Sequence, residues 1–262
     1  MIGRFAFVLA LAALEAWGQA PQPTVYVSAQ YLKWMPGMAE EGRKFATEVS
    51  NKVAVARNNA GGTLIGQVRL YRVFPTGHEA GHDTLRLLFR SSPPDLGATG
   101  GTPAAQLAGT GLTPAEYAKK LAAFAENVKV EIWTDVFRHG SMSEGDFVRV
   151  SYVDPPKDLT AEYATFEREQ SSGMAEELIK KGTIKGWDVW RLSLTPNSAP
   201  YNFVSVVVNK DSSGLFKSFG KQTEAYSAAH PTGDYNRYFI RYRELNNVVK
   251  TVVYRVDSAI WK

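Results

Sequence analysis

Cysteine is absent from this chain of 262 residues, which excludes disulfides, thiolate metal ligands and cysteine nucleophiles together. A strong excess of one charge is also missing, because 30 Lys and Arg residues face 26 Asp and Glu residues. The basic residues are dispersed, without the clustered patch and stacking aromatics of a nucleic-acid binder. Hydrophobic residues make up 44% of the chain, enough for a sizeable core. The composition predicts a globular protein that does not bind nucleic acid.

Long apolar runs are scarce, and the one short run lies at the N-terminus. Arg4 precedes ten consecutive apolar residues, which are too few to span a membrane. Small residues follow at Gly18 and Ala20, in the spacing of a signal-peptidase site. We therefore expect residues 1–20 to be a signal peptide and the mature protein to be secreted or periplasmic, with no membrane span.

Several catalytic motifs are missing as well. The chain has no glycine-rich phosphate loop, no G-x-S-x-G nucleophile turn and no S-x-x-K. It does contain His78-Glu79-Ala-Gly-His82, which matches the H-E-x-x-H zinc motif. That motif needs a helix, whereas Gly81 and the strand patterns on both sides favour a hairpin loop. A metalloprotease and a weak metal site at His78, Glu79 and His82 remain the alternatives.

Two further histidines are candidates for an axial ligand of haem. His139 lies between the two halves of the chain and His230 lies just after a predicted helix, where a surface or capping role is favoured over haem ligation. We predict no cofactor.

An internal repeat is the strongest positive signal. Gly62-Thr-Leu-Ile-Gly66 recurs 120 positions later as Gly182-Thr-Ile-Lys-Gly186. Each copy is followed by a strand pattern, a proline, a polar loop and a β-branched run. We predict two repeats, 21–145 and 146–262, each with the order β-α-β-β-α-β.

The expected elements follow from apolar spacing and turn residues. Strands are predicted at 24–31, 64–74, 83–90, 131–137, 147–153, 187–194, 202–209, 238–243 and 251–256. Helices are predicted at 38–58, 113–128, 158–181 and 214–229, the second of them opened by a capping box at Thr113 and Glu116. The Gly- and Pro-rich segment 91–112 is expected to be a flexible insertion.

Three stretches carry a family resemblance: Gly182–Arg191, the strand that follows Tyr201, and Tyr254–Trp261. On these the chain resembles exported members, without an assigned function, of the dimeric α/β-barrel (ferredoxin-like) superfamily. The resemblance implies an α+β fold in which two fused ferredoxin-like β-α-β-β-α-β repeats pack as one dimeric-α/β-barrel-type domain. Because the fusion supplies the pairing that single-copy relatives obtain by dimerising, we expect a monomer.

The same resemblance leaves the function open, since the superfamily includes cofactor-free monooxygenases, haem-handling enzymes and plain binding proteins. We expect an exported protein that binds a small apolar or aromatic molecule in a barrel pocket. A cofactor-independent monooxygenase-like enzyme on an aromatic substrate is one alternative. A non-catalytic structural or interaction module is the other.

Aromatic residues supply the candidate site. Alternation along a strand sends Trp187 and Trp190 to opposite faces, so one faces the barrel interior and the other packs under a helix. Such residues are also the usual content of a core. We predict a pocket walled by Trp133, Trp190 and Tyr201, with Arg72, Arg191, Asn202 or Asp188 as polar anchors.

Overall fold

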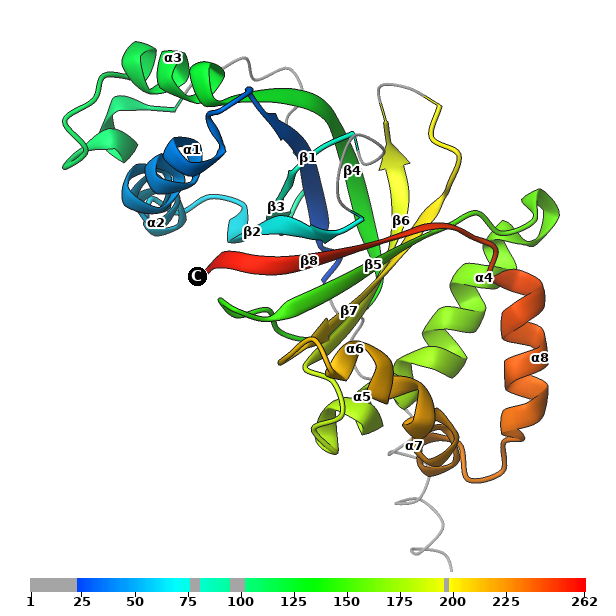
Figure 1. Cartoon of the computed structure of the whole chain (residues 1–262). Coiled ribbons are helices and arrows are strands. Elements are labelled where there is room, and N and C mark those ends of the chain that lie inside the picture. Colours follow the sequence, from blue (N-terminus) through cyan, green and yellow to red (C-terminus); the bar gives the residue numbers. More distant parts are fainter. Residues whose placement is uncertain (1–22, 76–80, 95–101, 196–197) are drawn as a thin grey trace, which may run out of the picture.

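The computed structural model describes residues 23–75, 81–94, 102–195 and 198–262, without the side chains of residues 216–219. Eight antiparallel strands close into one barrel in the order β1-β3-β2-β8-β5-β7-β6-β4 (Figure 1). The strands are β1 (Tyr26–Trp34), β2 (Leu64–Phe74), β3 (Thr84–Arg90), β4 (Ala125–Gly140), β5 (Phe147–Val153), β6 (Gly186–Leu194), β7 (Phe203–Asn209) and β8 (Val248–Trp261).

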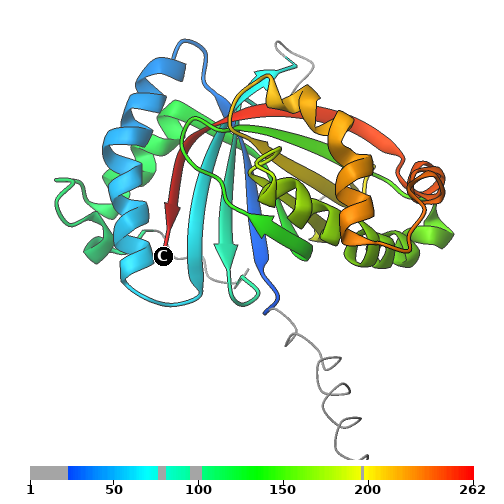
Figure 2. The same cartoon turned by 90° about the horizontal axis from the view of Figure 1, so that it is seen from below.

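The helices form two groups on opposite sides of the barrel (Figures 1 and 2). One group contains α1 (Ala39–Phe45), α2 (Asn51–Asn59) and α3 (Pro114–Phe124). The other contains α4 (Thr160–Phe166), α5 (Ser172–Lys180), α6 (Gly214–Lys217), α7 (Gln222–Ala229) and α8 (Tyr235–Leu245). A π-helical turn joins α1 to α2 at Ala46–Ser50, and another joins α4 to α5 at Glu167–Ser171. The structure is therefore an α+β barrel with its helices outside.

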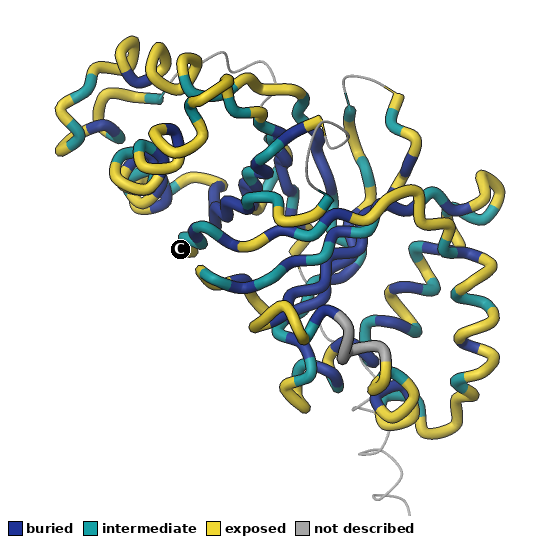
Figure 3. Tube along the Cα trace, in the orientation of Figure 1, coloured by how far each residue is buried: buried dark blue, intermediate teal, exposed yellow. Residues whose placement is uncertain are grey.

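Strand alternation decides which side chains fill the barrel. On β5, Val148, Val150 and Tyr152 point inward and are at most 3% exposed, whereas the alternate residues Arg149 and Ser151 point toward the outer helices. The buried residues consequently run along the strands, while the outer faces of the helices are exposed (Figure 3). The barrel core is dominated by aliphatic and aromatic side chains.

The sequence prediction is wrong at 238–243, which is not a strand but part of α8. The side chain of Asp234 accepts hydrogen bonds from the backbone N–H groups of Asn236 and Arg237, which caps the helix. Tyr238 and Tyr242 then share the helix face that packs on the sheet. This i, i+4 spacing outweighs the β propensity of the aromatic residues.

The predicted helix 113–128 is confirmed at its start and wrong at its end. Both hydrogen bonds of the capping box between Thr113 and Glu116 are present. The helix stops at Phe124, however, and β4 begins at once, so Val128 lies on a strand and is 44% exposed. In the segment predicted as an insertion, Leu107 is buried against α2 and α3, and residues 95–101 lie outside the described part.

The predicted signal peptide, 1–20, also lies outside the described residues. Among the residues described, no helix combines the length and the apolar character needed to cross a bilayer.

Candidate functional site

The aromatic residues predicted to wall a pocket lie in the barrel core. Trp133, Trp190 and Tyr201 are each at most 2% exposed. The rings of Trp133 and Tyr201 are nearly parallel, with centroids 6.0 Å apart, and Trp190 packs edge-on against Phe89. Their position inside the barrel is as predicted, and their role in ligand binding stays a prediction.

Beside them lies a buried carboxylate that the sequence analysis missed. Glu131 is fully buried and accepts hydrogen bonds from the hydroxyls of Tyr31 and Tyr201, each at 2.7 Å. Lys129 Nζ donates to the same carboxylate at 2.7 Å. A charged residue at an inward position of a strand was the available signal, because burial of an unpaired charge costs several kcal/mol, so such a residue requires partners.

The two predicted arginine anchors lie on different faces of the barrel wall. Arg72 points inward, and its Nη2 forms a 3.2 Å ion pair with Asp83. Arg191 is exposed on the outer face, so the structure does not bring it to the pocket. The position 120 residues after Arg72 is Leu192, which packs against the barrel core. Arg191 precedes Leu192 by one residue, and a step of one residue along a strand reverses the face to which the side chain points.

The other two predicted anchors have hydrogen-bond partners of their own. Asn202 is exposed and donates to Asp154 at 2.8 Å. Asp188 is buried and accepts a hydrogen bond from the backbone N–H of His139 at 3.1 Å. Burial raises the pKa of Asp188 to about 8.

A cavity lies on the outer side of the barrel wall, between the sheet and the helices of the second half. Its volume is about 410 Å³, and residues of β5, β6, β7, β8, α5, α7 and α8 line it. Pockets that bind small molecules typically have volumes of about 300–1,000 Å³. This cavity is therefore large enough for a ligand of two or three fused rings.

The floor of the cavity is a row of hydroxyls. Ser151 on β5 is the register partner of Ser205 on β7 and of Thr251 on β8. The hydroxyls of Ser151 and Thr251 are 3.2 Å apart, and the indole N–H of Trp187 donates to Ser205 Oγ at 3.0 Å. Each hydroxyl retains hydrogen-bonding capacity toward the cavity, because a serine or threonine oxygen serves as one donor and two acceptors.

The walls add aromatic surface and one cation. Trp187, Phe239 and Tyr242 contribute rings, and Arg149 contributes a guanidinium group. Arg149 Nη1 also donates to the backbone carbonyl of Leu215 at 3.3 Å, which holds the side chain in place. The cavity can thus take a flat apolar body that carries an anionic or hydrogen-bonding group.

An ionisable carboxyl group lies behind this wall. Glu167, in the π-helical turn, is fully buried, and its burial raises its pKa to about 7. The pKa of Tyr242 is raised by burial and by the charge of Glu167, and is lowered by the guanidinium of Arg149. Tyr242 thus lies within electrostatic reach of both groups. Glu167 and Arg149 were not singled out from sequence, although a polar outward face on β5 beneath a helix layer was a usable signal.

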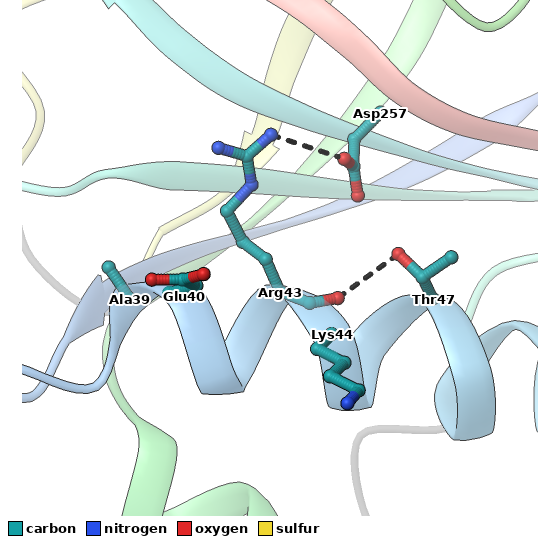
Figure 4. Close-up of a pocket in the computed structure, with 6 residues that line it drawn as sticks. All are labelled: Ala39, Glu40, Arg43, Lys44, Thr47 and Asp257. Carbon is teal, nitrogen blue, oxygen red and sulfur yellow. Dashed lines mark hydrogen bonds and ion pairs between the residues drawn. The ribbon is translucent and has the colours of Figure 1, made fainter.

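A second hollow lies along α1 and is lined by Ala39, Glu40, Arg43, Lys44, Thr47 and Asp257 (Figure 4). Arg43 forms a 3.7 Å ion pair with Asp257, and Thr47 donates to the Arg43 carbonyl. Its lining residues other than Ala39 are polar or charged and none is aromatic, so it lacks the aromatic walls typical of a site for a small organic ligand.

The histidines considered as metal or haem ligands have other partners. His78 and Glu79 lie outside the described residues, whereas His82 is buried with its Nε2 2.7 Å from the Tyr254 hydroxyl. His139 Nε2 lies 2.7 Å from Ser172 Oγ, and His230 Nε2 lies 2.9 Å from the backbone oxygen of Gln170. Within the described part of the chain, no group of three or more His, Asp or Glu side chains is placed to hold a metal ion.

Solved structures of three proteins share this fold over nearly the whole chain. A monooxygenase candidate from Lactobacillus acidophilus NCFM has a TM-score of 0.56 at 12% identity, covering 92% of this chain and 97% of its own. A second monooxygenase candidate, from Fusobacterium nucleatum subsp. nucleatum ATCC 25586, has a TM-score of 0.55 at 11% identity, covering 93% and 96%. An anthrone oxidase-like protein has a TM-score of 0.50 at 11% identity, covering 92% and 94%.

Sequence comparison adds nothing to this likeness, because no family model and no curated protein matches the chain. At such identities the structural likeness shows the fold alone. The fold is that of the dimeric α/β-barrel type.

Proposed function

We propose that this protein binds a small aromatic molecule in the cavity between the outer face of β5, β7 and β8 and the helices α5, α7 and α8. The observation that carries the proposal is the composition of that cavity: a hydroxyl floor, aromatic walls and the guanidinium of Arg149 around about 410 Å³. Apolar walls with a few convergent polar groups are typical of ligand sites.

The polar groups indicate the chemical class of the ligand. Arg149 favours an anionic or strongly accepting oxygen, and Ser151 and Ser205 can bond a hydroxyl or carbonyl group. The rings of Trp187 and Tyr242 favour a flat apolar body. A phenol, or a ketone that can enolise, combines these features.

A second candidate function is oxygenation of that ligand without a cofactor. Glu167 does not line the cavity, but its pKa is raised to about 7 and it acts electrostatically on the cavity-lining Tyr242, so it is suited to take up a proton relayed from the ligand through that hydroxyl. The shared fold with two monooxygenase candidates and an anthrone oxidase-like protein supports the same reading.

The reaction balances with the substrate as reductant. A CH₂ group beside the aromatic ring loses a proton, and the resulting carbanion transfers its electrons to O₂. One oxygen atom stays on that carbon as a carbonyl, the second hydrogen leaves, and the other oxygen atom departs as water. Arg149 stabilises the intermediate anion by its charge.

Native mass spectrometry and oxygen uptake separate the candidates. A retained ligand that is lost in a cavity-filling Ser205→Phe variant supports binding. Oxygen uptake with a panel of anthrones and quinols, lost in Glu167→Gln, supports oxygenation. If the wild-type protein neither retains nor binds an aromatic molecule, both candidates fail. The remaining function is then that of a non-catalytic structural or interaction module.

We further propose that the barrel consists of two fused ferredoxin-like repeats. The strand order β4-β1-β3-β2 of the first half has the same pattern as β8-β5-β7-β6 of the second, and each half carries a π-helical turn in its first long helix. Because β2 pairs with β8 and β4 with β6, one chain closes the barrel. A monomer is expected, and a stable dimer in light scattering would contradict it.

Export is proposed on the pattern of residues 1–20 alone. Arg4, the apolar run after it and Ala20 support cleavage before Pro21. N-terminal sequencing of the protein from cells that express the full chain tests it. A protein that keeps Met1 and stays in the cytosol contradicts both cleavage and a secreted or periplasmic location.

A further inference from the structure

Three basic side chains point into the same end of the barrel from three different strands. Lys129 on β4 is the register partner of Tyr31, and Lys250 on β8 is the register partner of Tyr152. Arg72 on β2 is the register partner of Tyr254. Because directly paired residues point to the same face of a sheet, each basic side chain projects inward beside a buried tyrosine. We call Lys129, Lys250 and Arg72 the barrel-mouth cations.

Lys250 has aromatic partners but no ion pair. Its Nζ lies 4.3 Å from the ring centre of Tyr152 and 5.3 Å from that of Tyr201. In the described part of the chain no carboxylate forms an ion pair with Lys250, and the buried Glu131 is paired with Lys129 instead. Burial lowers the pKa of Lys250, the neighbouring charge of Lys129 lowers it further, and Glu131 raises it. Lys250 is itself exposed, so the cluster presents at the barrel mouth an ammonium group that has no carboxylate partner among the described residues and that an anion can reach.

Lys129 also lies over the ring of Tyr201. Its Nζ lies 4.2 Å from the ring centre of Tyr31 and 5.2 Å from that of Tyr201. It is paired with Glu131, but that carboxylate already accepts hydrogen bonds from Tyr31 and Tyr201. Glu131 therefore organises the tyrosines and neutralises one lysine, and Lys250 remains unneutralised.

Arg72 presents a buried donor that has no acceptor. Its side chain is 7% exposed, and Nη2 pairs with Asp83. Nη1 is buried and has no hydrogen-bond partner among the described residues. Leaving a buried donor unpaired is unfavourable, and an acceptor oxygen placed there would satisfy it.

The cations are linked through the tyrosines. The positive charge of Arg72 acts on the buried hydroxyl of Tyr254, which is electrostatically coupled to Tyr152, and Lys250 lies over the Tyr152 ring. Three cations face two carboxylates, Glu131 and Asp83, which leaves an excess of one positive charge. The aromatic rings around this charge favour a ligand that is itself partly apolar.

We propose that this end of the barrel is a second binding site, for a small organic anion of the carboxylate or phenolate class, held by Lys129, Lys250 and Arg72. The site lies on the inner face of the barrel wall, whereas the cavity lined by Arg149 lies on the outer face. It therefore does not depend on the function proposed for that cavity.

Titration calorimetry with benzoate tests the site, with neutral benzamide as the isosteric comparison. Wild-type protein is expected to bind benzoate at least about tenfold more tightly than benzamide, because the contacts are charge-assisted. Lys250→Met is expected to weaken benzoate binding about tenfold or more. Lys210→Met, which removes an exposed lysine with the same charge, should leave it unchanged. Lys250→Gln, compared with wild type by circular dichroism, controls for misfolding.

Arg149→Met separates the two sites. Benzoate binding that survives Arg149→Met and is lost in Lys250→Met and Lys250→Gln supports the barrel-mouth site. Binding that is lost in Arg149→Met and kept in Lys250→Met places benzoate in the outer cavity and overturns this proposal. No binding of benzoate by the wild-type protein at millimolar concentration also overturns it, and leaves the outer cavity untouched.

Discussion

Trp187 and Trp190 lie on the same strand with their indoles on opposite sides of the barrel wall. Trp190 faces the interior and packs edge-on against Phe89, with ring centroids 5.9 Å apart. Trp187 faces the helices and donates its indole N–H to Ser205 at 3.0 Å. The two residues therefore probe two separate environments, the barrel core and the outer cavity.

Fluorescence should distinguish these environments. An aromatic ligand such as anthrone, bound in the outer cavity, is expected to quench Trp187 because that indole lines it. Trp187→Phe should lose most of the quenching, and Trp190→Phe should keep it. Equal loss in both variants, measured by steady-state titration, would argue against a ligand in this cavity.

Arg149 should matter for affinity and Arg191 should not. Removal of a charge-assisted contact in Arg149→Met is expected to cost about 1.5–3 kcal/mol, at least about tenfold in the Kd for anthrone. Arg191 is exposed on the outer face of β6 and does not line the cavity, so Arg191→Met is the matched control. The fluorescence titration with anthrone measures the Kd of each variant. A similar loss of affinity in Arg149→Met and Arg191→Met would refute a specific role for Arg149.

Glu167 should make the fold less stable as the pH rises. Its pKa is about 7 in the folded protein against an ordinary value of 4.5. Between these values the unfolded chain has released a proton that the folded chain keeps, so the free energy of unfolding falls as the pH rises. The fall is about 1.4 kcal/mol per pH unit and ends near pH 7, for a total of about 3 kcal/mol.

Thermal unfolding of Glu167→Gln checks this dependence. The Tm of the variant relative to wild type should increase between pH 5 and pH 8. Glu169→Gln, which alters an exposed carboxylate in the same turn, should show no such trend. Asp188, whose pKa is raised to about 8, adds a background slope that all three proteins share. A Tm difference for Glu167→Gln that does not change with pH would show that the carboxyl is not held protonated.

Glu131 should be needed for stability. Glu131→Gln removes a carboxylate that accepts from Tyr31, Tyr201 and Lys129, which is expected to cost about 1–3 kcal/mol in urea unfolding. Glu126→Gln, on an exposed position of the same strand, should cost less than about 0.5 kcal/mol. Equal urea midpoints of unfolding for the two variants would mean that the hydrogen bonds of Glu131 contribute little to the free energy of unfolding.

Local patterns in the sequence predicted most of the elements and both faces of β6. The capping box at Thr113 and Glu116 and the opposite faces of Trp187 and Trp190 rest on short-range geometry, and both are confirmed. The error at 238–243 arose because aromatic residues suit strands and helices alike. The N-cap at Asp234 and the packing of the segment against the sheet stabilise the helix instead of a strand.

The candidate site was less accessible to sequence reasoning. Arg191 was predicted as a polar anchor of the barrel pocket, but it lies on the outer face of β6, away from the barrel interior. Glu131 and Arg149 each stand among apolar neighbours on their strands, and no local pattern says which partners they meet. Their roles depend on residues far away in the chain.

The sequence by itself determined the strands, their inward and outward faces and most helices, because those depend on the period of residues close along the chain. Only the tertiary structure decided that Ser151, Ser205 and Thr251 form one floor, and that Lys129, Lys250 and Arg72 meet at one end of the barrel. The physical reason is register: barrel closure sets which residues of distant strands lie side by side, and that depends on the packing of the whole core.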